Sequence, residues 1–332
     1  MRTARIVTLA VAAVVIVASV VPLDAARSDD GAQFVSMWGS SGTEPGQFVG
    51  PFDVGVDGEG FVYVTDPGNH RVQKFTREGT FVLQWGSQGT GPGEFMKPTG
   101  IAIGPNDTVY VSDYFTDTVQ QFTREGGFLR SWGKSGKQPG EFDSPAGLAV
   151  GRDGAVYVID EYNFRVQKFT PDGQFLTAWG EKGKVNVVIS ALNFLLPDDR
   201  EGQFYYPSRL VVGPDNLVYV ADSYNNRVQV FTTEGRFVRK WGGLGFWGGR
   251  FRVTSDIAFD QAGHILVADF YNNRIQIFVA DGTYLDEFGQ QGEKPGQFDG
   301  PTGLAISAVG DVYVVDFHNN RIQRFRLREE GS

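Results

Sequence analysis

Short apolar runs alternate with turn-forming residues along most of the chain. Runs such as Phe61–Val64 and Val156–Val158 are followed by an Asp two residues later, and a second run of the form Arg-Val-Gln-x-Phe comes a few residues after that. Short apolar runs bounded by Gly, Pro, Asn and Asp predict antiparallel β-strands joined by tight turns. Strict alternation of apolar and polar residues is blurred, which indicates sheets that are covered on both faces.

A repeat of fixed length organises these strands. Trp38, Trp85, Trp132 and Trp179 are each 47 residues apart, Trp241 follows 62 residues later, and Phe288 takes the sixth place after another 47. Each repeat opens with Gly-x-Phe, at Phe48, Phe95, Phe142, Phe204, Phe251 and Phe298. A period of about 40–50 residues with four strands per repeat predicts an all-β, six-bladed β-propeller with four-stranded antiparallel blades.

An Asp-x-x-Asn-x-Arg frame lies between the second and third strand of most repeats. Asp at a strand end accepts turn N–H groups, and Arg pairs with it as a fork, so we interpret the frame as structural. Its members are Asp66, Asn69, Arg71, Asp160, Arg165, Asp222, Arg227, Asp269, Arg274, Asp316 and Arg321. Blade two has Asp113, but Thr116 and Thr118 replace the Asn and the Arg. We therefore expect an irregular loop in blade two.

These motifs resemble the NHL repeat family, whose blades read Gly-x-Phe-x-x-Pro-x-Gly, Val-Tyr-Val-x-Asp, Asn-x-Arg-Val-Gln and Trp-Gly. The resemblance covers residues 34–326 and six copies match. It implies an exported, bacterial-type NHL repeat protein with a propeller that serves as a binding platform or, in relatives, as an enzyme.

The two ends of the repeat region complement each other. Residues 34–39 form a fourth strand without the three that precede it, whereas the last repeat ends at Phe325 without a fourth strand. We expect the first strand to complete the last blade and so remove the open edges of the ring. The propeller then spans 34–326, after a linker at 27–33 and before a tail at 327–332.

Residues 1–26 differ from the repeats. Arg2 and Arg5 precede the uncharged apolar run Ile6–Val21, which is typical of a signal peptide or of a short N-terminal membrane anchor. Either reading predicts an extracytoplasmic protein, secreted or membrane-anchored. The sequence has no Cys and a formal charge of −9, and an acidic surface disfavours nucleic acids.

Two sets of side chains are candidates for ligand binding. The first lies at the start of the innermost strands, near the channel mouth, and consists of Asp53, Arg209 and Asp256; a simple pairing of Arg209 with Asp256 is the structural alternative. The second follows the second strands and consists of Tyr114, Tyr162, Tyr224, Tyr271 and His318, for which packing between blades is the alternative.

The sequence predicts no cofactor. Zinc-binding histidines of the amidating lyases related to this repeat would follow the Pro of each repeat, where this chain has Phe52, Thr99, Ala146, Ser208, Ser255 and Thr302. Calcium in the channel stays open as an alternative, although Asp53 and Asp256 supply few of the six to eight oxygens it prefers.

An insertion at about 184–198 enlarges the connection before blade four. It is apolar, and with residues of the next such connection it forms a candidate partner patch of Val188, Leu192, Phe194, Leu195, Phe246 and Trp247. A lid, a docking or dimer surface and a closed satellite core are the three interpretations, because exposed apolar surface is costly.

The sequence favours a binding or scaffold module for a protein, peptide or cell-envelope ligand over an enzyme. The ligand would lie on the face formed by the connections from the fourth strand to the first and from the second to the third, the d–a/b–c face. The alternative is a peptidyl-amidoglycolate lyase-like or gluconolactonase-like enzyme with a variant channel site. We expect a monomer, with a dimer through the insertion as the alternative.

Overall fold

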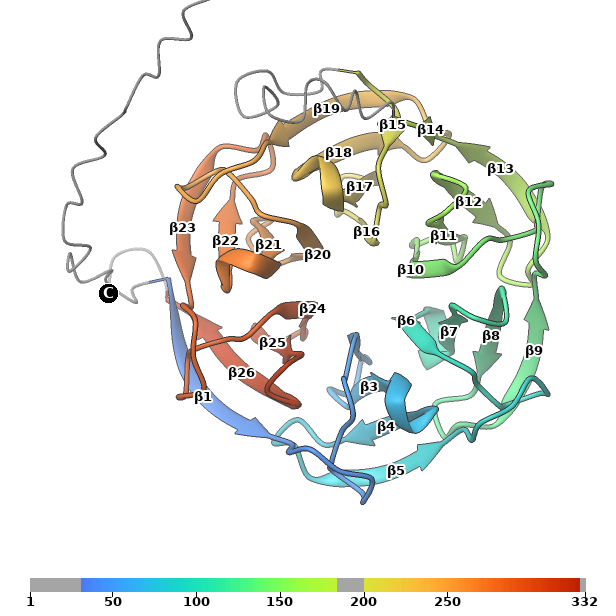
Figure 1. Cartoon of the computed structure of the whole chain (residues 1–332), viewed down its shortest axis with the longest axis horizontal. Coiled ribbons are helices and arrows are strands. Elements are labelled where there is room, and N and C mark those ends of the chain that lie inside the picture. Colours follow the sequence, from blue (N-terminus) through green and yellow to red (C-terminus); the bar gives the residue numbers. More distant parts are fainter. Residues whose placement is uncertain (1–30, 184–199, 329–332) are drawn as a thin grey trace, which may run out of the picture.

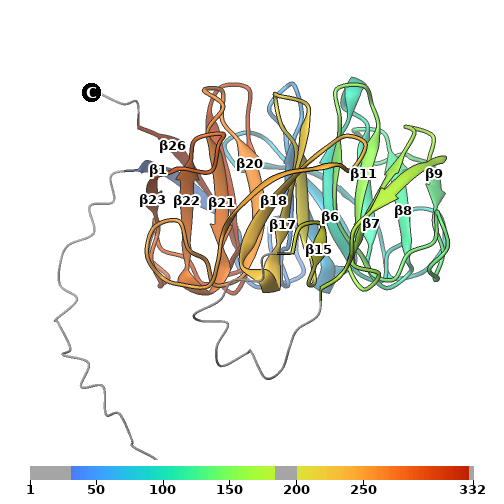
Figure 2. The ribbon, with the colours of Figure 1, turned by 90° about the horizontal axis from the view of Figure 1, so that it is seen from above.

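Six sheets form a ring around a central channel. The computed structural model describes residues 31–183 and 200–328, and each of its six main sheets has four antiparallel strands (Figure 1). Seen from the side, the ring is a disc whose strands run between two faces that carry the connections (Figure 2). The predicted six-bladed propeller is confirmed.

The strands of each blade follow one another from the channel outward, as strands a, b, c and d. Blades one to three contain β2 (Val54–Val56), β3 (Val62–Asp66), β4 (Arg71–Phe75) and β5 (Phe81–Trp85); β6 (Pro98–Ile103), β7 (Val109–Asp113), β8 (Thr118–Phe122) and β9 (Phe128–Trp132); and β10 (Pro145–Val150), β11 (Val156–Asp160), β12 (Arg165–Phe169) and β13 (Phe175–Trp179). Blades four to six contain β16 (Arg209–Val212), β17 (Leu217–Asp222), β18 (Arg227–Thr232) and β19 (Phe237–Gly242); β20 (Thr254–Phe259), β21 (Ile265–Asp269), β22 (Arg274–Phe278) and β23 (Tyr284–Phe288); and β24 (Pro301–Ile306), β25 (Asp311–Asp316), β26 (Arg321–Leu327) and β1 (Ala32–Trp38).

The ring closes through its first strand. β1 pairs antiparallel with β26, from Ala32 opposite Leu327 to Trp38 opposite Ile322. The Phe34 and Phe325 rings meet edge to face, with centroids 5.9 Å apart. The predicted closure is confirmed, and the strand begins two residues earlier than its apolar pattern suggested.

The repeated Trp residues connect each blade to the next. Trp38 lies against Gly79 in the c–d turn of the next blade, where a Cβ would come within 2.5 Å of the indole. The same contact joins Trp85 to Gly126, Trp132 to Gly173, Trp179 to Gly235 and Trp241 to Gly282. Strand d of blade five faces blade six, which has no c–d turn because its outer strand comes from the N-terminal end. Phe288 replaces Trp there and packs on Phe325, with centroids 5.0 Å apart.

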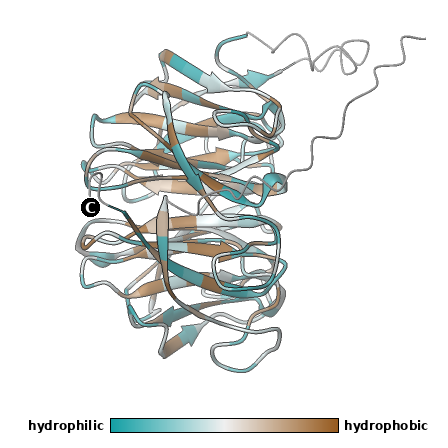
Figure 3. Ribbon diagram, turned by 90° about the vertical axis from the view of Figure 1, so that its left-hand side faces the viewer, coloured by the Kyte–Doolittle hydropathy of each residue, from teal (hydrophilic) through white to brown (hydrophobic). Residues whose placement is uncertain are grey.

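Aromatic and β-branched side chains fill the space between blades. The Phe of each Gly-x-Phe motif has no exposed surface, and neither do most side chains of strands b and c. Hydrophobic and hydrophilic segments both occur along the strands that face the viewer, and hydrophilic segments lie at many of the turns (Figure 3). Packing between blades therefore buries both sheet faces, which explains the blurred alternation in the sequence.

Blade two keeps the common b–c turn, so the predicted irregular loop is wrong. Residues 114–117 connect β7 to β8, a connection of the same length as in the other blades. Asp117 adopts the left-handed conformation (φ 57°) that His70 and Asn226 adopt in their turns (φ 55° each). Its Oδ1 accepts a hydrogen bond from Ser144 N at 2.8 Å, as Asn226 Oδ1 does from Val253 N. Asp117 thus makes the contact that Asn226 makes, at the position after the Asn of the frame.

The two ends of the connection that carries the insertion pair with each other, as the ends of the d–a connections do in the other blades. β14 (Glu181–Lys182) and β15 (Gln203–Phe204) pair in parallel, where other blades have single parallel bridges such as Ser41 with Phe48. Val188, Leu192, Phe194 and Leu195, like residues 1–26, lie outside the described residues. Within residues 31–183 and 200–328, no helix is long and apolar enough to cross a membrane.

Candidate functional site

The Asp–Arg frame joins three segments of each blade. Arg227 Nε donates to Asp222 Oδ2 at 2.7 Å, and Asp222 also accepts from Tyr205 N and Asn225 Nδ2. Nη2 of the arginine reaches Gln203 O in the d–a connection at 2.8 Å. Equivalent pairs join Arg71 to Asp66, Arg165 to Asp160, Arg274 to Asp269 and Arg321 to Asp316, at 2.7–3.0 Å. Such contacts tie the b–c turn to the d–a connection and suit a structural role.

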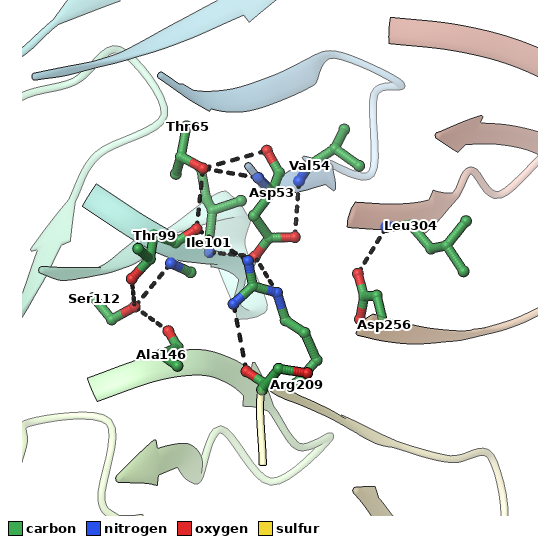
Figure 4. A network of polar contacts seen from close by, with 12 residues as sticks. Asp53, Val54, Thr65, Thr99, Ile101, Ser112, Ala146, Arg209, Asp256 and Leu304 are labelled. Carbon is green, nitrogen blue, oxygen red and sulfur yellow. Dashed lines mark hydrogen bonds and ion pairs between the residues drawn. The ribbon is translucent and has the colours of Figure 1, made fainter. Parts of the chain in front are cut away.

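A charged layer crosses the channel at the start of the strands a. Arg209, in blade four, extends over Gly147 to blade one, where its Nε lies 3.4 Å from Asp53 Oδ2 (Figure 4). A Cβ on Gly147 would come within 2.7 Å of the arginine Cδ, so glycine leaves room for this path. Nη2 of Arg209 donates to Thr99 O at 3.2 Å, and the guanidinium lies over Phe52.

Asp256 is not the partner of Arg209, so the pairing considered from the sequence is wrong. The two carboxylate oxygens of Asp256 accept backbone N–H groups from Ile257 and Leu304, each at 2.7 Å. Asp53 is held in the same way by Val54 N and Ile101 N. Each aspartate therefore links its blade to the next, and the long arginine side chain reaches the opposite wall.

Burial dominates the electrostatics of this layer. Asp53, Arg209 and Asp256 are 3%, 3% and 5% exposed. Burial raises the pKa of Asp53 above its usual range, although the Arg209 charge opposes the shift. Burial, together with the charge of Asp53, raises the pKa of Asp256 well above its usual range. The three side chains thus form a buried polar layer at the start of the strands a.

Tyrosine rings form an arc on the d–a/b–c face, above blades two to four. The ring centroids of Tyr114 and Tyr162 are 6.4 Å apart, those of Tyr162 and Tyr206 5.3 Å, and those of Tyr206 and Tyr224 5.5 Å. Tyr162 and Tyr224 remain 46% and 57% exposed although they pack against their neighbours. The structure therefore combines packing between blades with a free aromatic surface.

A second aromatic group lies above blades five and six. Phe270 contacts Tyr271 at 4.8 Å and His318 at 5.9 Å between ring centroids, and Phe317 contacts His318 at 4.8 Å. Tyr271 is also 55% exposed. The predicted aromatic residues thus divide into two groups on one face.

Glu161 lies beside the tyrosine arc. Burial raises the pKa of its carboxyl to about 7, against the opposing effects of the Lys97 and Arg209 charges and of the Tyr114 hydroxyl. Burial also lowers the pKa of Lys97, whose Nζ lies 4.3 Å from the Tyr114 ring centroid. A carboxyl with a pKa near neutrality has the properties of a proton acceptor or of a pH-sensitive ligand contact.

The described histidines lie apart. His70 Nδ1 is 2.9 Å from Met96 O, His264 Nδ1 is 2.9 Å from Asp260 Oδ2, and His318 packs on aromatic rings. Among the residues that the structure describes, no group of three or more His, Cys, Asp or Glu side chains is arranged to hold a metal ion.

Comparisons with known proteins agree with this architecture. A model of the NHL repeat matches residues 142–169, 204–231, 251–278 and 298–325, and a model described as a 6-bladed β-propeller matches residues 56–121. The chain is an NHL-repeat propeller. A search of curated proteins found no match.

Solved structures with the same fold include enzymes and proteins of unknown function. A streptogramin B lyase is 15% identical, with a TM-score of 0.58 over 90% of this chain and 98% of its own. A gluconolactonase from Xanthomonas campestris is 12% identical, with a TM-score of 0.62 over 90% and 95%. A virginiamycin B lyase from Staphylococcus aureus, bound to quinupristin, is 14% identical, with a TM-score of 0.57 over 91% and 97%. At these identities the likeness shows the fold alone.

Sequence reasoning missed several residues of the NHL-repeat propeller's d–a/b–c face. The position after the strand-b Asp is occupied by Pro67, Tyr114, Glu161, Ser223, Phe270 and Phe317. Glu161 is the one ionisable carboxyl in that set. This difference from the other repeats is the sequence signal that could have identified it. Tyr206 and Lys97 occupy equivalent places just before the strand-a Pro, where blades one and six have Gly. Phe246 and Trp247, of the predicted partner patch, are 66% and 49% exposed.

Proposed function

We propose that the NHL-repeat propeller is an extracytoplasmic binding module whose protein, peptide or cell-envelope ligand lies on the d–a/b–c face. The observation that carries the proposal is the tyrosine arc from Tyr114 to Tyr224, which contacts Glu161 and Lys97. Tyrosine combines a flat apolar ring with a hydroxyl and loses little conformational freedom on binding, which makes it frequent at recognition sites. The apolar run Ile6–Val21 supports the extracytoplasmic location.

Neighbouring charges favour a polar ligand with some apolar surface. Glu161 supplies an acceptor, and Lys97 a donor, next to rings that are partly exposed. The Lys97 ammonium already occupies the face of Tyr114, so the arc is not an empty cage for a ligand cation. Peptides and glycopeptides of the cell envelope present both hydrogen-bonding groups and apolar surface, and fit this combination.

A selection experiment with paired variants tests the proposal. Peptides are selected from a phage-displayed library, and peptidoglycan fragments are screened in parallel, against the propeller without residues 1–26. Tyr162→Ala combined with Tyr224→Ala should weaken the selected ligands by at least tenfold, because aromatic hot-spot residues often contribute about 2 kcal/mol or more. The control combines Leu129→Ala with Leu176→Ala, two exposed residues of the outer strands (46% and 50%). Equal loss in both variants, or none in the tyrosine variant, contradicts the proposal.

Glu161 favours a second candidate function, an enzyme of the lyase or lactonase type. A carboxyl with a pKa near 7 is matched to proton abstraction at neutral pH, and Tyr114 and Lys97 lie close to it. In this function Glu161 would take the proton from the carbon, or from the attacking water, that the reaction requires. Incubation with a streptogramin B and with gluconolactone tests it. Turnover that Glu161→Gln abolishes supports the candidate, whereas no turnover of either compound removes these two substrate classes.

A further inference from the structure

The central channel contains a cavity that lies apart from the tyrosine arc. Its volume is 190 Å³, and its polar end consists of Asp53, Arg209 and Asp256. The remaining lining is aliphatic and comes from the strands a, with Ile101, Leu148, Ile257 and Leu304 nearest to the charged layer. A cavity of about 150 Å³ accommodates benzene, so this one has room for a small organic molecule.

The cavity faces the a–b/c–d side of the disc. Its lining extends to the last residues of strands a, such as Ile103, Val150 and Val212, which are half-buried and precede the a–b turns. The charged end lies at the other end of the cavity, where Asp53, Arg209 and Asp256 are at most 5% exposed. A ligand would therefore enter with its polar group first and leave its apolar body among the aliphatic walls.

The charged layer has hydrogen-bonding capacity that the protein does not use. Nε of Arg209 is buried and has no hydrogen-bond acceptor, since its approach to Asp53 is an ion pair without hydrogen-bond geometry. Leaving a buried donor unsatisfied costs free energy, which a ligand acceptor would recover. Asp256 accepts two backbone N–H groups but has no cation within ion-pair distance among the described residues. Burial without such a cation raises the pKa of Asp256 well above its usual range, and in its protonated form the carboxyl is a second donor.

Charge balance selects the class of ligand. Arg209 and Asp53 neutralise each other, and a protonated Asp256 adds no charge. An ion of either sign would leave an uncompensated charge in a buried site. We propose that the channel cavity binds a small neutral molecule that has an apolar body and a carbonyl oxygen at its polar end. The carbonyl accepts from Arg209 Nε and from the Asp256 carboxyl.

Three probes of one shape test the charge preference with the unmodified propeller. Cyclohexanone, cyclohexylammonium and cyclohexanecarboxylate share a ring but carry a neutral carbonyl, a cation and an anion. Binding is measured at pH 7 by NMR shifts of the isoleucine and leucine methyl groups that line the cavity. Cyclohexanone should bind at least tenfold more tightly than either ion. Tighter binding of the ammonium, or no shift of these methyl groups with any probe, overturns the proposal.

Two variants test the donors separately. Asp256→Asn fixes a neutral side chain at this position, but its amide nitrogen cannot accept one of the two backbone N–H groups that Asp256 accepts. Arg209→Met should weaken cyclohexanone binding at least tenfold. In the unmodified protein binding should weaken as the pH rises through the pKa of Asp256, and in Asp256→Asn this dependence should disappear. Asp53 and Arg209 are the other ionisable residues that line the cavity in the described chain. Binding that survives Arg209→Met in a folded protein contradicts the assigned carbonyl contact. Because this site opens on the face opposite the tyrosine arc, its failure leaves the proposed function untouched.

Discussion

Arg209 Nε lies 3.4 Å from Asp53 Oδ2, across the channel between blades four and one. Nη2 of the same arginine reaches Thr99 O in blade two, so this side chain joins walls of the channel that are not neighbours in the ring. It sets the position of the charged layer that divides the channel, and so separates the tyrosine arc on one face from the cavity that opens on the other.

Removal of Arg209 should destabilise the fold. Arg209→Met leaves the buried Asp53 carboxylate without its cation, which typically costs roughly 3–5 kcal/mol. Urea unfolding followed by tryptophan fluorescence measures the loss. Arg130→Met is the matched control, because Arg130 pairs with Asp172 on the surface (46% and 70% exposed) and such pairs contribute about 0–1 kcal/mol. Similar losses in the two variants would show that the trans-channel pair adds no special stability.

Replacing the aspartate at the end of strand b should destabilise the fold more in a blade where an arginine pairs with that aspartate. Asp222→Ala removes the buried carboxylate that pairs with Arg227 Nε and should destabilise the protein by roughly 3–5 kcal/mol. Asp113→Ala, in blade two, removes hydrogen bonds to Met96 N and Lys97 N but leaves no arginine behind, and should cost less. Denaturant titration of both variants gives the comparison. A parent-like melt of Asp222→Ala together with lost ligand binding would make the frame functional rather than structural.

Ring closure should depend on β1. Deleting residues 32–38 exposes the edge of β26 and removes the Phe34–Phe325 contact, so we expect aggregation or a large fall in the melting temperature. Val35→Ala, at a position 40% exposed on the same strand, should leave both properties unchanged. Light scattering and thermal unfolding measure them, and a monomeric deletion variant with the parent melting curve contradicts the closure.

Glu161 should make stability depend on pH. Its pKa is raised from 4.5 to about 7 by burial, so between these values only the folded state holds the proton. Stability therefore falls as the pH rises through this window, and the penalty is fully present above about pH 7. Glu161→Gln removes this penalty. From pH 5 to pH 7.5 the free energy of unfolding of the variant should therefore rise relative to that of the parent by on the order of 1–2 kcal/mol. This magnitude follows from about 1.4 kcal/mol per pKa unit, reduced for partial solvent exposure. Urea unfolding at both pH values measures this gain; an unchanged difference between the two proteins contradicts the raised pKa.

The repeated motifs in the sequence predict the fold well, but they do not predict which side chains pair across the channel. The Trp spacing and the Gly-x-Phe motifs give the number of blades because each repeat builds one sheet, and the unmatched strand at 34–39 gives the closure. The sequence also places Asp53, Arg209 and Asp256 in one layer. It does not show which of them pair, since both aspartates accept two backbone N–H groups and the pairing depends on where the Arg209 side chain reaches across the channel.

Residues of the d–a/b–c face were only partly predictable, for a related reason. Tyr114, Tyr162 and Tyr224 are visible as aromatic residues in equivalent turns. Tyr206 joins them through a connection from a different part of the repeat, so its contacts follow from the three-dimensional arrangement of neighbouring blades. The raised pKa of Glu161 likewise arises from burial by several blades, which no single repeat encodes.

The position of a bound ligand decides whether the propeller binds on its d–a/b–c face. Amide hydrogen–deuterium exchange is measured with and without a saturating peptide or peptidoglycan fragment obtained by selection. A ligand on this face should protect the b–c turns of blades two to four, at residues 114–117, 161–164 and 223–226, and the backbone around Tyr206. Protection confined to the a–b and c–d turns, or to the outer strands, would contradict a binding site on the d–a/b–c face.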